Sequence, residues 1–292
     1  MVLDRFFSRR KPVYEGKGKI LYDGPEPNTY IQHFKDDSTP SQDGAPQAVA
    51  GKGVLNNRIS AHIMSRLESV GIPTHFLRSI NMREQLVRKV EIIPIEVVVR
   101  NVAAGNFSKR LGVKEGTPMP RPLIEFYLKN SELENPLITE DHIYSFGWAD
   151  PYEIDEICLL AWRINDFLSG MFSALGLQLV DFKVEFGRIV GEFDEVYILL
   201  ADELSADSCR LWDVKNGNKW EKERFSEDKA SMIEAYQDLA RRLGLIPDAG
   251  IIQGGNVDEQ IAAGLETIEN ELANVRQLRS VNKGAATKPW KS

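Results

Sequence analysis

Apolar and charged side chains alternate in residues 177–187, LQLVDFKVEFG, and this pattern constrains the fold more than any other in the chain. Successive side chains of a β-strand point to opposite faces. One face of a strand here is therefore apolar, with Val180, Phe182, Val184 and Phe186, and the other carries Asp181, Lys183 and Glu185. Residues 195–203, EVYILLADE, follow after a short GEFD connection and predict a β-hairpin.

Other strand-rich runs open the chain within residues 13–35, where DGPEPN separates VYEGKGKILY from TYIQHFK and predicts a hairpin. Strand-like runs also occupy residues 85–90 and 92–99. Helical spacing of apolar residues predicts helices at about residues 55–70, 151–176 and 229–243. Strands and helices in this mixed order indicate an α+β protein and not a doubly wound parallel sheet.

Composition limits the location and the partners of the protein. The 292 residues include 36 Lys and Arg against 43 Asp and Glu, a formal net charge of -7, which argues against a general affinity for nucleic acid or an anionic membrane. The two cysteines lack the spacing of a zinc site, and no apolar run has the length of a signal peptide or a membrane span. These features predict a cytoplasmic protein that binds anions only at a local cationic site.

Several common catalytic motifs are missing from the sequence. Neither GxxxxGK[ST] nor GxGxxG occurs, which excludes a Walker phosphate loop and a Rossmann fingerprint. The four histidines show no metal-ligand spacing and no partner nucleophile, so zinc enzymes and hydrolases with a catalytic triad are disfavoured. His142 is expected to be a surface or capping histidine.

The EGKGK segment of the first hairpin points to phosphate chemistry. Gly16 and Gly18 let the backbone approach a ligand closely, and Lys17 and Lys19, two apart on a strand, are expected on one face. Such a strand can cover a nucleoside triphosphate, although paired lysines also occur on solvated edge strands.

Acidic residues offer a matching cation site. The hairpin brings Glu185 near Asp202, and Mg²⁺ is commonly held by one or two carboxylates together with substrate phosphates, although an exposed network of ion pairs would use the same residues. Further charges collect near predicted strand ends and favour a site for a multiply anionic substrate. They are Arg100, Lys109, Arg110, Asp207 and Arg210.

Residues beyond 247 differ in character from the rest. A Gly-rich joint leads to a predicted helix that starts at Asn256, and its apolar stripe from Ile261 to Val275 repeats every 3.5 residues over about two heptads. Packing on its own domain and contact between subunits both remain open. The final residues, 281–292, are expected to be disordered.

Eight segments together carry a family resemblance: YEGKGKILY, FKDD, GKGVLNNRIS, PIEVVVRNVAAG, KRLGVKEG, LVDFKVEFG, DELSADSCRLWD and YQDLARRLG. Over about residues 13–245 the chain resembles the SAICAR synthetase family, the phosphoribosylaminoimidazole-succinocarboxamide synthases of purine biosynthesis. The resemblance implies a small antiparallel β-rich domain at residues 1–90 and a larger α+β domain at 91–247. ATP would bind in a cleft similar to that of ATP-grasp enzymes and kinases, and residues 248–292 would form an extension.

The resemblance also implies the reaction. ATP drives the joining of carboxyaminoimidazole ribonucleotide (CAIR) with L-aspartate, through an acyl phosphate, to give SAICAR, ADP and phosphate. This chemistry needs no protein nucleophile, because catalysis comes from positioning and charge neutralisation. ATP as co-substrate, Mg²⁺ as cofactor and a homo-oligomer, with a dimer favoured, are the expected partners.

Residue roles follow by the same resemblance. It implies ATP contacts for Lys17, Gly18, Lys19 and Lys129, and Mg²⁺ binding by Glu185 and Asp202. It implies catalytic roles for Asp181, Lys183 and Asp207, and substrate contacts for Arg100, Asn106, Lys109, Arg110 and Arg210.

Three positions depart from the family pattern. Asn106 stands where the family usually has Ser, Ala206 where it has Pro, and Ser226 where it has Arg. Loss of a phosphate-binding Arg removes a charge-assisted contact. The alternative hypothesis is therefore a diverged paralogue that binds ATP with weak or altered ligase activity, or that serves as a non-catalytic partner.

Overall fold

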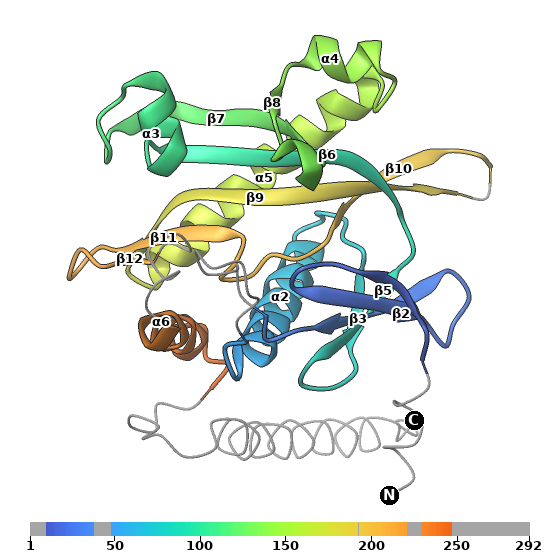
Figure 1. The fold of residues 1–292 in the computed structure, drawn as a ribbon, viewed down its shortest axis with the longest axis horizontal. Helices are drawn as coiled ribbons and strands as arrows, with labels where there is room; N and C mark the ends of the chain where they lie inside the picture. Colours follow the sequence, from blue (N-terminus) through green and yellow to red (C-terminus); the bar gives the residue numbers. More distant parts are fainter. Residues whose placement is uncertain (1–9, 38–47, 192, 221–228, 247–292) are drawn as a thin grey trace, which may run out of the picture.

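The alternating segment forms the central strand of the larger of two sheets (Figure 1). The structure, a computed structural model, describes residues 10–37, 48–191, 193–220 and 229–246. Strand β9 (Leu177–Val190) pairs antiparallel with three neighbours. They are β6 (Glu91–Val102), β10 (Val196–Ala201) and β11 (Cys209–Asp213). Beyond them, β7 (Pro118–Leu128), β8 (Leu137–Ile138) and β12 (Lys219–Trp220) extend the sheet.

The smaller sheet has the strand order β1-β2-β3-β5-β4 and is also antiparallel. Its strands are β1 (Pro12–Glu15), β2 (Lys19–Asp23), β3 (Thr29–Phe34), β4 (Phe76–Ser79) and β5 (Glu84–Arg88). The expectation of one strand through EGKGK was wrong. Residues 16–18 form a turn, closed by a 2.9 Å hydrogen bond from the Gly16 N–H to the Lys19 carbonyl, so Lys17 and Lys19 do not lie on one strand.

The three predicted helices are present. They are α2 (Lys52–Ser69), α5 (Pro151–Ala174) and α6 (Lys229–Arg242). Shorter helices are α3 (Gly105–Leu111), α4 (Glu140–Ser145) and the 3-10 turn η1 (Ser131–Leu133). Helix α5 begins at a capping box formed by Asp150 and Glu153. His142 caps α4, which confirms its expected capping role.

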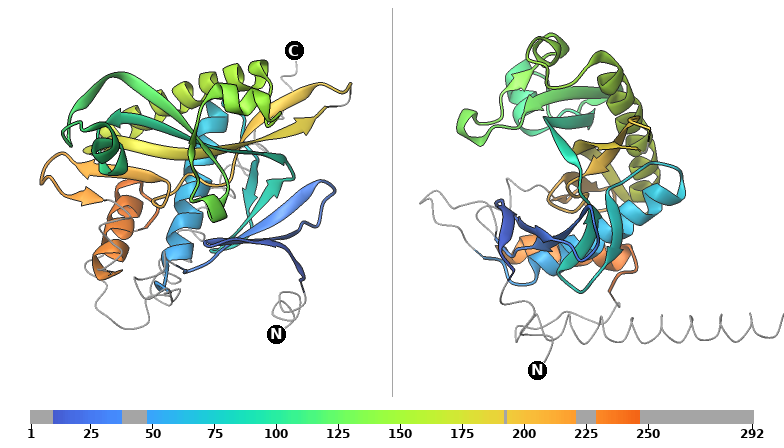
Figure 2. Two further views of the ribbon diagram at one scale, coloured as in Figure 1. Left: turned by 45° about the horizontal axis from the view of Figure 1, so that its top comes forward. Right: turned by 90° about the vertical axis from the view of Figure 1, so that its right-hand side faces the viewer.

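Helix α5 runs along one face of the larger sheet, and α2 packs on the smaller sheet and beside α6 (Figure 2). The apolar face of β9, with Phe182, Val184 and Phe186, packs in one buried cluster with Ile164 and Leu168 of α5. Residues of α2 and α6 belong to the same cluster, so the core continues from one sheet to the other. The charged face of β9 is therefore turned away from α5 and toward the smaller sheet.

The fold class agrees with the α+β expectation, because both sheets are antiparallel and the helices are not interleaved as in a doubly wound fold. The chain passes from the smaller to the larger sheet between β5 and β6. The division into domains stays a prediction, and the helix expected from Asn256 and the tail lie outside the described residues. Among the helices described, none combines the length and apolar character needed to cross a bilayer.

Replacement of Leu168 by Ala tests the packing of α5 on the sheet. Leu168 is fully buried, so its truncation is expected to lower the free energy of unfolding by about 2–5 kcal/mol. Leu159→Ala on the same helix is the control, since Leu159 is 49% exposed and should change stability by less than about 1 kcal/mol. Urea unfolding measures both, and equal losses would contradict this packing.

Candidate active site between the two sheets

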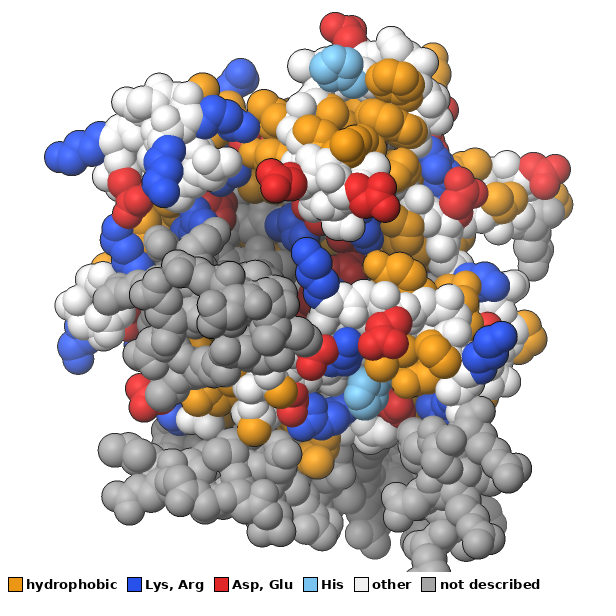
Figure 3. Space-filling model, viewed as in Figure 1, with side chains coloured by type: hydrophobic (Ala, Val, Ile, Leu, Met, Phe, Trp, Pro, Cys, Tyr) orange, Lys and Arg blue, Asp and Glu red, His pale blue; other side chains and the backbone are white. Residues whose placement is uncertain are grey.

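A cavity of about 330 Å³ lies between the smaller sheet and the larger one. Figure 3 shows Lys, Arg, Asp and Glu side chains gathered in a recess between the part of the molecule with the smaller sheet and the part with the larger sheet. Part of the cavity wall is apolar, with Leu21, Val87, Val90, Ile92 and Pro94. The rest is mainly polar and includes Lys19, Gln32, His75, Lys129, Glu185 and Asp202. A pocket of this size with few convergent charges is typical of a small-ligand site.

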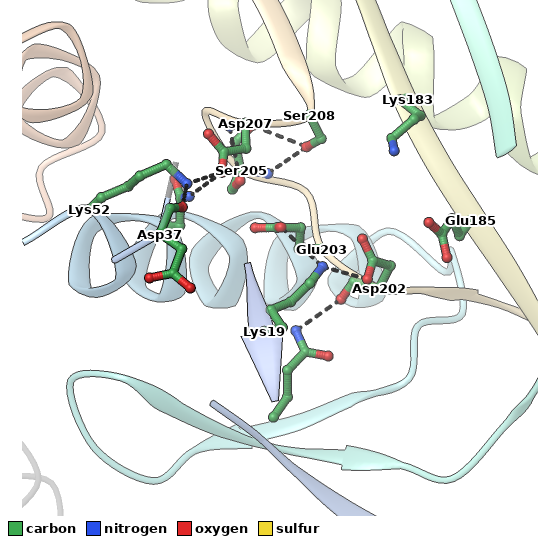
Figure 4. Close-up of polar contacts among 12 residues, drawn as sticks. Lys19, Asp37, Lys52, Lys183, Glu185, Asp202, Glu203, Ser205, Asp207 and Ser208 are labelled. Atoms are coloured by element: carbon green, nitrogen blue, oxygen red, sulfur yellow. Dashed lines mark hydrogen bonds and ion pairs between the residues drawn. The ribbon is translucent and has the colours of Figure 1, made fainter. Parts of the chain in front are cut away.

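The register of the β9–β10 hairpin brings the two predicted magnesium ligands together. Ala201 pairs with Glu185, and Asp202 follows at once with φ 59°, in the left-handed region. Lys19 of β2 forms ion pairs with Asp202 and, at 3.0 Å, with Glu203, so it links the two sheets (Figure 4). Lys129 forms an ion pair with Glu185.

Burial and neighbouring charges shift the pKa values of this cluster. Burial alone would raise the pKa of Asp202, but Lys19, together with Lys129 and Lys183, outweighs it and lowers that pKa to about 2. Burial raises the pKa of Glu185, and Asp202 raises it further, against the effect of Lys129. Burial opposes the charge of Lys19, but Asp202 and Glu203 hold the pKa of its ammonium above the ordinary range. Lys19 and Asp202 are therefore both charged at neutral pH.

The donor set suits a cation shared with a ligand. Glu185 and Asp202 supply carboxylate oxygens at one end of the cavity, and Oε2 of the adjacent Glu203 is buried without a hydrogen-bond partner. In the described ranges, no group of three or more His, Cys, Asp or Glu side chains is arranged to hold a metal. Magnesium commonly uses one or two carboxylates and takes its remaining ligands from water and phosphate. The residues present fit that mode of binding and not a closed protein cage.

Two arginines bracket Asp181 on the charged face of β9. Nη1 of Arg100 is 3.1 Å and Nη1 of Arg210 is 3.0 Å from the same Asp181 oxygen. Gly105 has φ 55°, and a Cβ there would lie 2.9 Å from the Arg210 guanidinium. Glycine is required at this position, both for its backbone conformation and for the close approach of the arginine. Glu125 pairs with the other side of the Arg100 guanidinium, at 2.7 Å from its Nε, and also forms an ion pair with Arg110.

Asp207 lies in a network of side chains from two helices. Its carboxylate accepts hydrogen bonds from Lys52 and Asn56 of α2, the latter at 3.0 Å, and from the Tyr236 hydroxyl of α6. Only 2% of the Lys52 side chain is exposed. This network joins both helices to the loop that follows β10.

Of the other predicted site residues, some contact charged partners and some are exposed away from the cavity. Lys183 forms a 2.7 Å ion pair with Glu96 of β6. Lys17 is exposed in the turn before β2, with Gly18 beside it, and does not line the cavity. Asn106 and Lys109 are exposed on α3, whereas Arg110 reaches Glu125.

Sequence reasoning assigned no role to several residues of these networks: Lys52, Asn56, Glu96, Glu125 and Tyr236. Lys52 and Asn56 are four apart, and the structure places both on one face of α2, which begins at Lys52 and not at about residue 55. That spacing was an available signal. Nothing in the local sequence relates Glu96 or Glu125 to the partners they contact across the sheet.

Comparisons with known proteins agree with this arrangement. The family model described as SAICAR synthetase matches residues 12–243. Phosphoribosylaminoimidazole-succinocarboxamide synthase of Parvibaculum lavamentivorans is 60% identical over 239 residues, which is 82% of this chain and 94% of the relative. The crystal structure of the synthase from Ehrlichia chaffeensis is 45% identical, with a TM-score of 0.77, and covers 82% of this chain and 100% of its own.

A SAICAR synthetase solved in complex with ADP is 39% identical, with a TM-score of 0.72, and the match covers 79% of this chain and 96% of that one. The family match extends over both sheets and over the site residues described above. The chain belongs to the SAICAR synthetase family.

Proposed function

We propose that this protein is the ATP-dependent ligase that joins CAIR with L-aspartate to give SAICAR, ADP and phosphate in purine biosynthesis. The observation that carries the proposal is the cavity between the sheets, where Lys19, Lys129, Glu185 and Asp202 meet beside an apolar wall. Membership of the family and relatives at 57–60% identity support the same activity. No observation favours the diverged paralogue.

The cavity suits a nucleotide in one orientation. The apolar wall, with Leu21, Val87 and Ile92, would pack against the adenine, and the charged end would receive the phosphates. The ADP complex of the relative at 39% identity supports nucleotide binding. Lys19 and Lys129 would contact the phosphates, and Lys17 with Gly18 would contribute from the turn before β2.

Glu185 and Asp202 would hold Mg²⁺. A bound magnesium ion would neutralise phosphate charge. The chain's own residues orient the nucleotide, because Lys19 is fixed by Asp202 and Glu203 at the junction of the two sheets.

The reaction needs two transfers. An oxygen of the CAIR carboxylate attacks the γ-phosphorus and ADP leaves, which gives the acyl phosphate. The aspartate amine then attacks the acyl carbon, loses a proton, and phosphate leaves. We place Asp181, Lys183 and Asp207 at the reacting groups, and positioning and neutralisation of charge would provide the catalysis.

The substrate anions would bind at the other end of the charged face of β9, around Asp181. Arg100 and Arg210 present guanidinium groups already oriented by Asp181. Pre-organised guanidinium groups favour bidentate contacts with phosphate and carboxylate. We also place Asn106, Lys109 and Arg110 near the substrate, from α3.

Two of the three positions that depart from the family pattern can be located. Asn106 is exposed on α3, and Ala206 packs against the main apolar cluster. Ser226 lies outside the described residues. The lining of the cavity includes neither Asn106 nor Ala206, so both departures leave the nucleotide end of the site unchanged.

Asp202→Asn is expected to lower kcat by about 10²–10³ or more, because the site loses one of two carboxylates at the phosphate end. ADP release coupled to NADH oxidation measures the rate with CAIR and aspartate. Thermal unfolding checks the fold. Retention of wild-type turnover in a folded variant would refute the metal role of Asp202.

Arg210→Met is expected to raise KM for CAIR about tenfold or more and to leave KM for ATP within about twofold, since a lost charge-assisted contact costs about 1.5–3 kcal/mol. Arg121→Met on β7 is the matched control, because Arg121 is exposed and lies outside the cavity lining. Steady-state kinetics with each substrate varied in turn distinguish the sites. A larger change in KM for ATP than for CAIR would contradict the assignment.

We also propose a cytoplasmic homodimer. Sedimentation equilibrium of the full chain should give twice the mass of 33.0 kDa. A mass of one chain at working concentrations would exclude the dimer without affecting the proposed reaction.

A further inference from the structure

The main-chain carbonyl of Asp202 is held by two side chains that no sequence pattern singles out. Nε2 of Gln32, on β3, donates a hydrogen bond of 3.2 Å to this oxygen, and Nε2 of His75 lies 3.0 Å from it. Gln32 is 2% and His75 4% exposed. Both come from the part of the chain that forms the smaller sheet, whereas Asp202 follows β10 of the larger one.

The backbone fixes His75 in this place. The His75 N–H donates 2.8 Å to the Leu200 carbonyl, and the Leu200 N–H donates 3.0 Å to the Pro73 carbonyl. Thr74 and Leu200 thereby form a parallel bridge, so the chain before β4 runs beside the end of β10. The imidazole then reaches the carbonyl two residues further on.

The protonation state of His75 suits a donor role. A carbonyl oxygen has no hydrogen and accepts only from a nitrogen that bears one. At 3.0 Å from the Asp202 carbonyl, Nε2 of His75 therefore carries a proton, and the two lone pairs of this oxygen match the two donors.

The conformation of Asp202 explains why two donors are needed. Its φ of 59° lies in the left-handed region, which is unfavourable for a residue with a side chain. Such a conformation persists only where the surroundings hold it. In this conformation the carboxylate reaches Lys19 and faces Glu185 (Figure 4).

We propose that His75 and Gln32 are positioning residues for Asp202. Their hydrogen bonds to its carbonyl hold the left-handed backbone that directs its carboxylate to the Mg²⁺ and phosphate end of the cavity. The inference rests on the proposed function, in which Asp202 holds magnesium with the nucleotide.

Calorimetry of ADP binding to the full chain, with and without Mg²⁺, tests this inference. His75→Leu removes the donor, and His75→Gln keeps an amide donor on a side chain of similar reach. His75→Leu is expected to reduce the Mg²⁺-dependent gain in ADP affinity about tenfold, the equivalent of one lost hydrogen bond, and to leave affinity without Mg²⁺ within about twofold. His75→Gln should retain the gain within about threefold.

Gln32→Leu removes the other donor to the Asp202 carbonyl, and its ADP binding tests the positioning role even if His75→Leu does not fold. It should reduce the same gain in the same direction. His142→Gln is the matched control, because His142 is exposed on α4 and lies outside the cavity lining. Thermal unfolding identifies folded variants.

Three results would overturn the inference: an unchanged Mg²⁺-dependent gain in folded His75→Leu or Gln32→Leu, an equal loss with and without Mg²⁺, or a His75→Gln variant as impaired as His75→Leu. Asp202→Asn separates this failure from failure of the proposed function. If Asp202→Asn loses the gain while the Leu variants keep it, only the positioning role is wrong. If the wild-type protein shows no gain, the metal assignment is wrong as well.

Discussion

Strand β9 is hydrogen-bonded to β6, β10 and β11, and these three pairings decide where the charges of the molecule meet. Its apolar face must pack on α5, so the opposite face can only point into the space beside the smaller sheet. A shift of register by one residue would bury Asp181, Lys183 and Glu185 in the apolar core. The hydrophobic packing of one face therefore specifies the position of the charged face.

Charges at this face are balanced before any ligand binds. Lys19 contacts both Asp202 and Glu203, and two Arg side chains share Asp181. Removing charged groups from water costs several kcal/mol for each ion, and close pairing with further hydrogen bonds recovers only part of this. Such pairs are weak evidence for stability. Their concentration along the charged face of β9 and the adjacent end of β10 is better explained by a need to hold charged groups in fixed positions for a substrate.

The sequence predicted elements whose periodicity is local, and it failed where partners are distant. The β9–β10 hairpin and α5 were predictable because each buries one regular face. The turn at residues 16–18 was missed because two glycines permit a tight turn as readily as an extended strand. Contacts of Asp202 with Gln32 and His75 span 170 and 127 residues, and no local pattern reports such pairings.

The pairing of lysines with carboxylates also limits which anions the cavity can bind. The two lysines that line it already face carboxylates: Lys19 faces Asp202 and Glu203, and Lys129 faces Glu185. A bare triphosphate would bring about four negative charges into this group and would be repelled by the carboxylates. A nucleotide that arrives with a divalent cation brings positive charge to those same carboxylates and releases the lysines for the phosphates. In the function proposed above, the acidic residues would favour a metal–nucleotide complex over other polyanions, a form of selectivity that lysines alone would not provide.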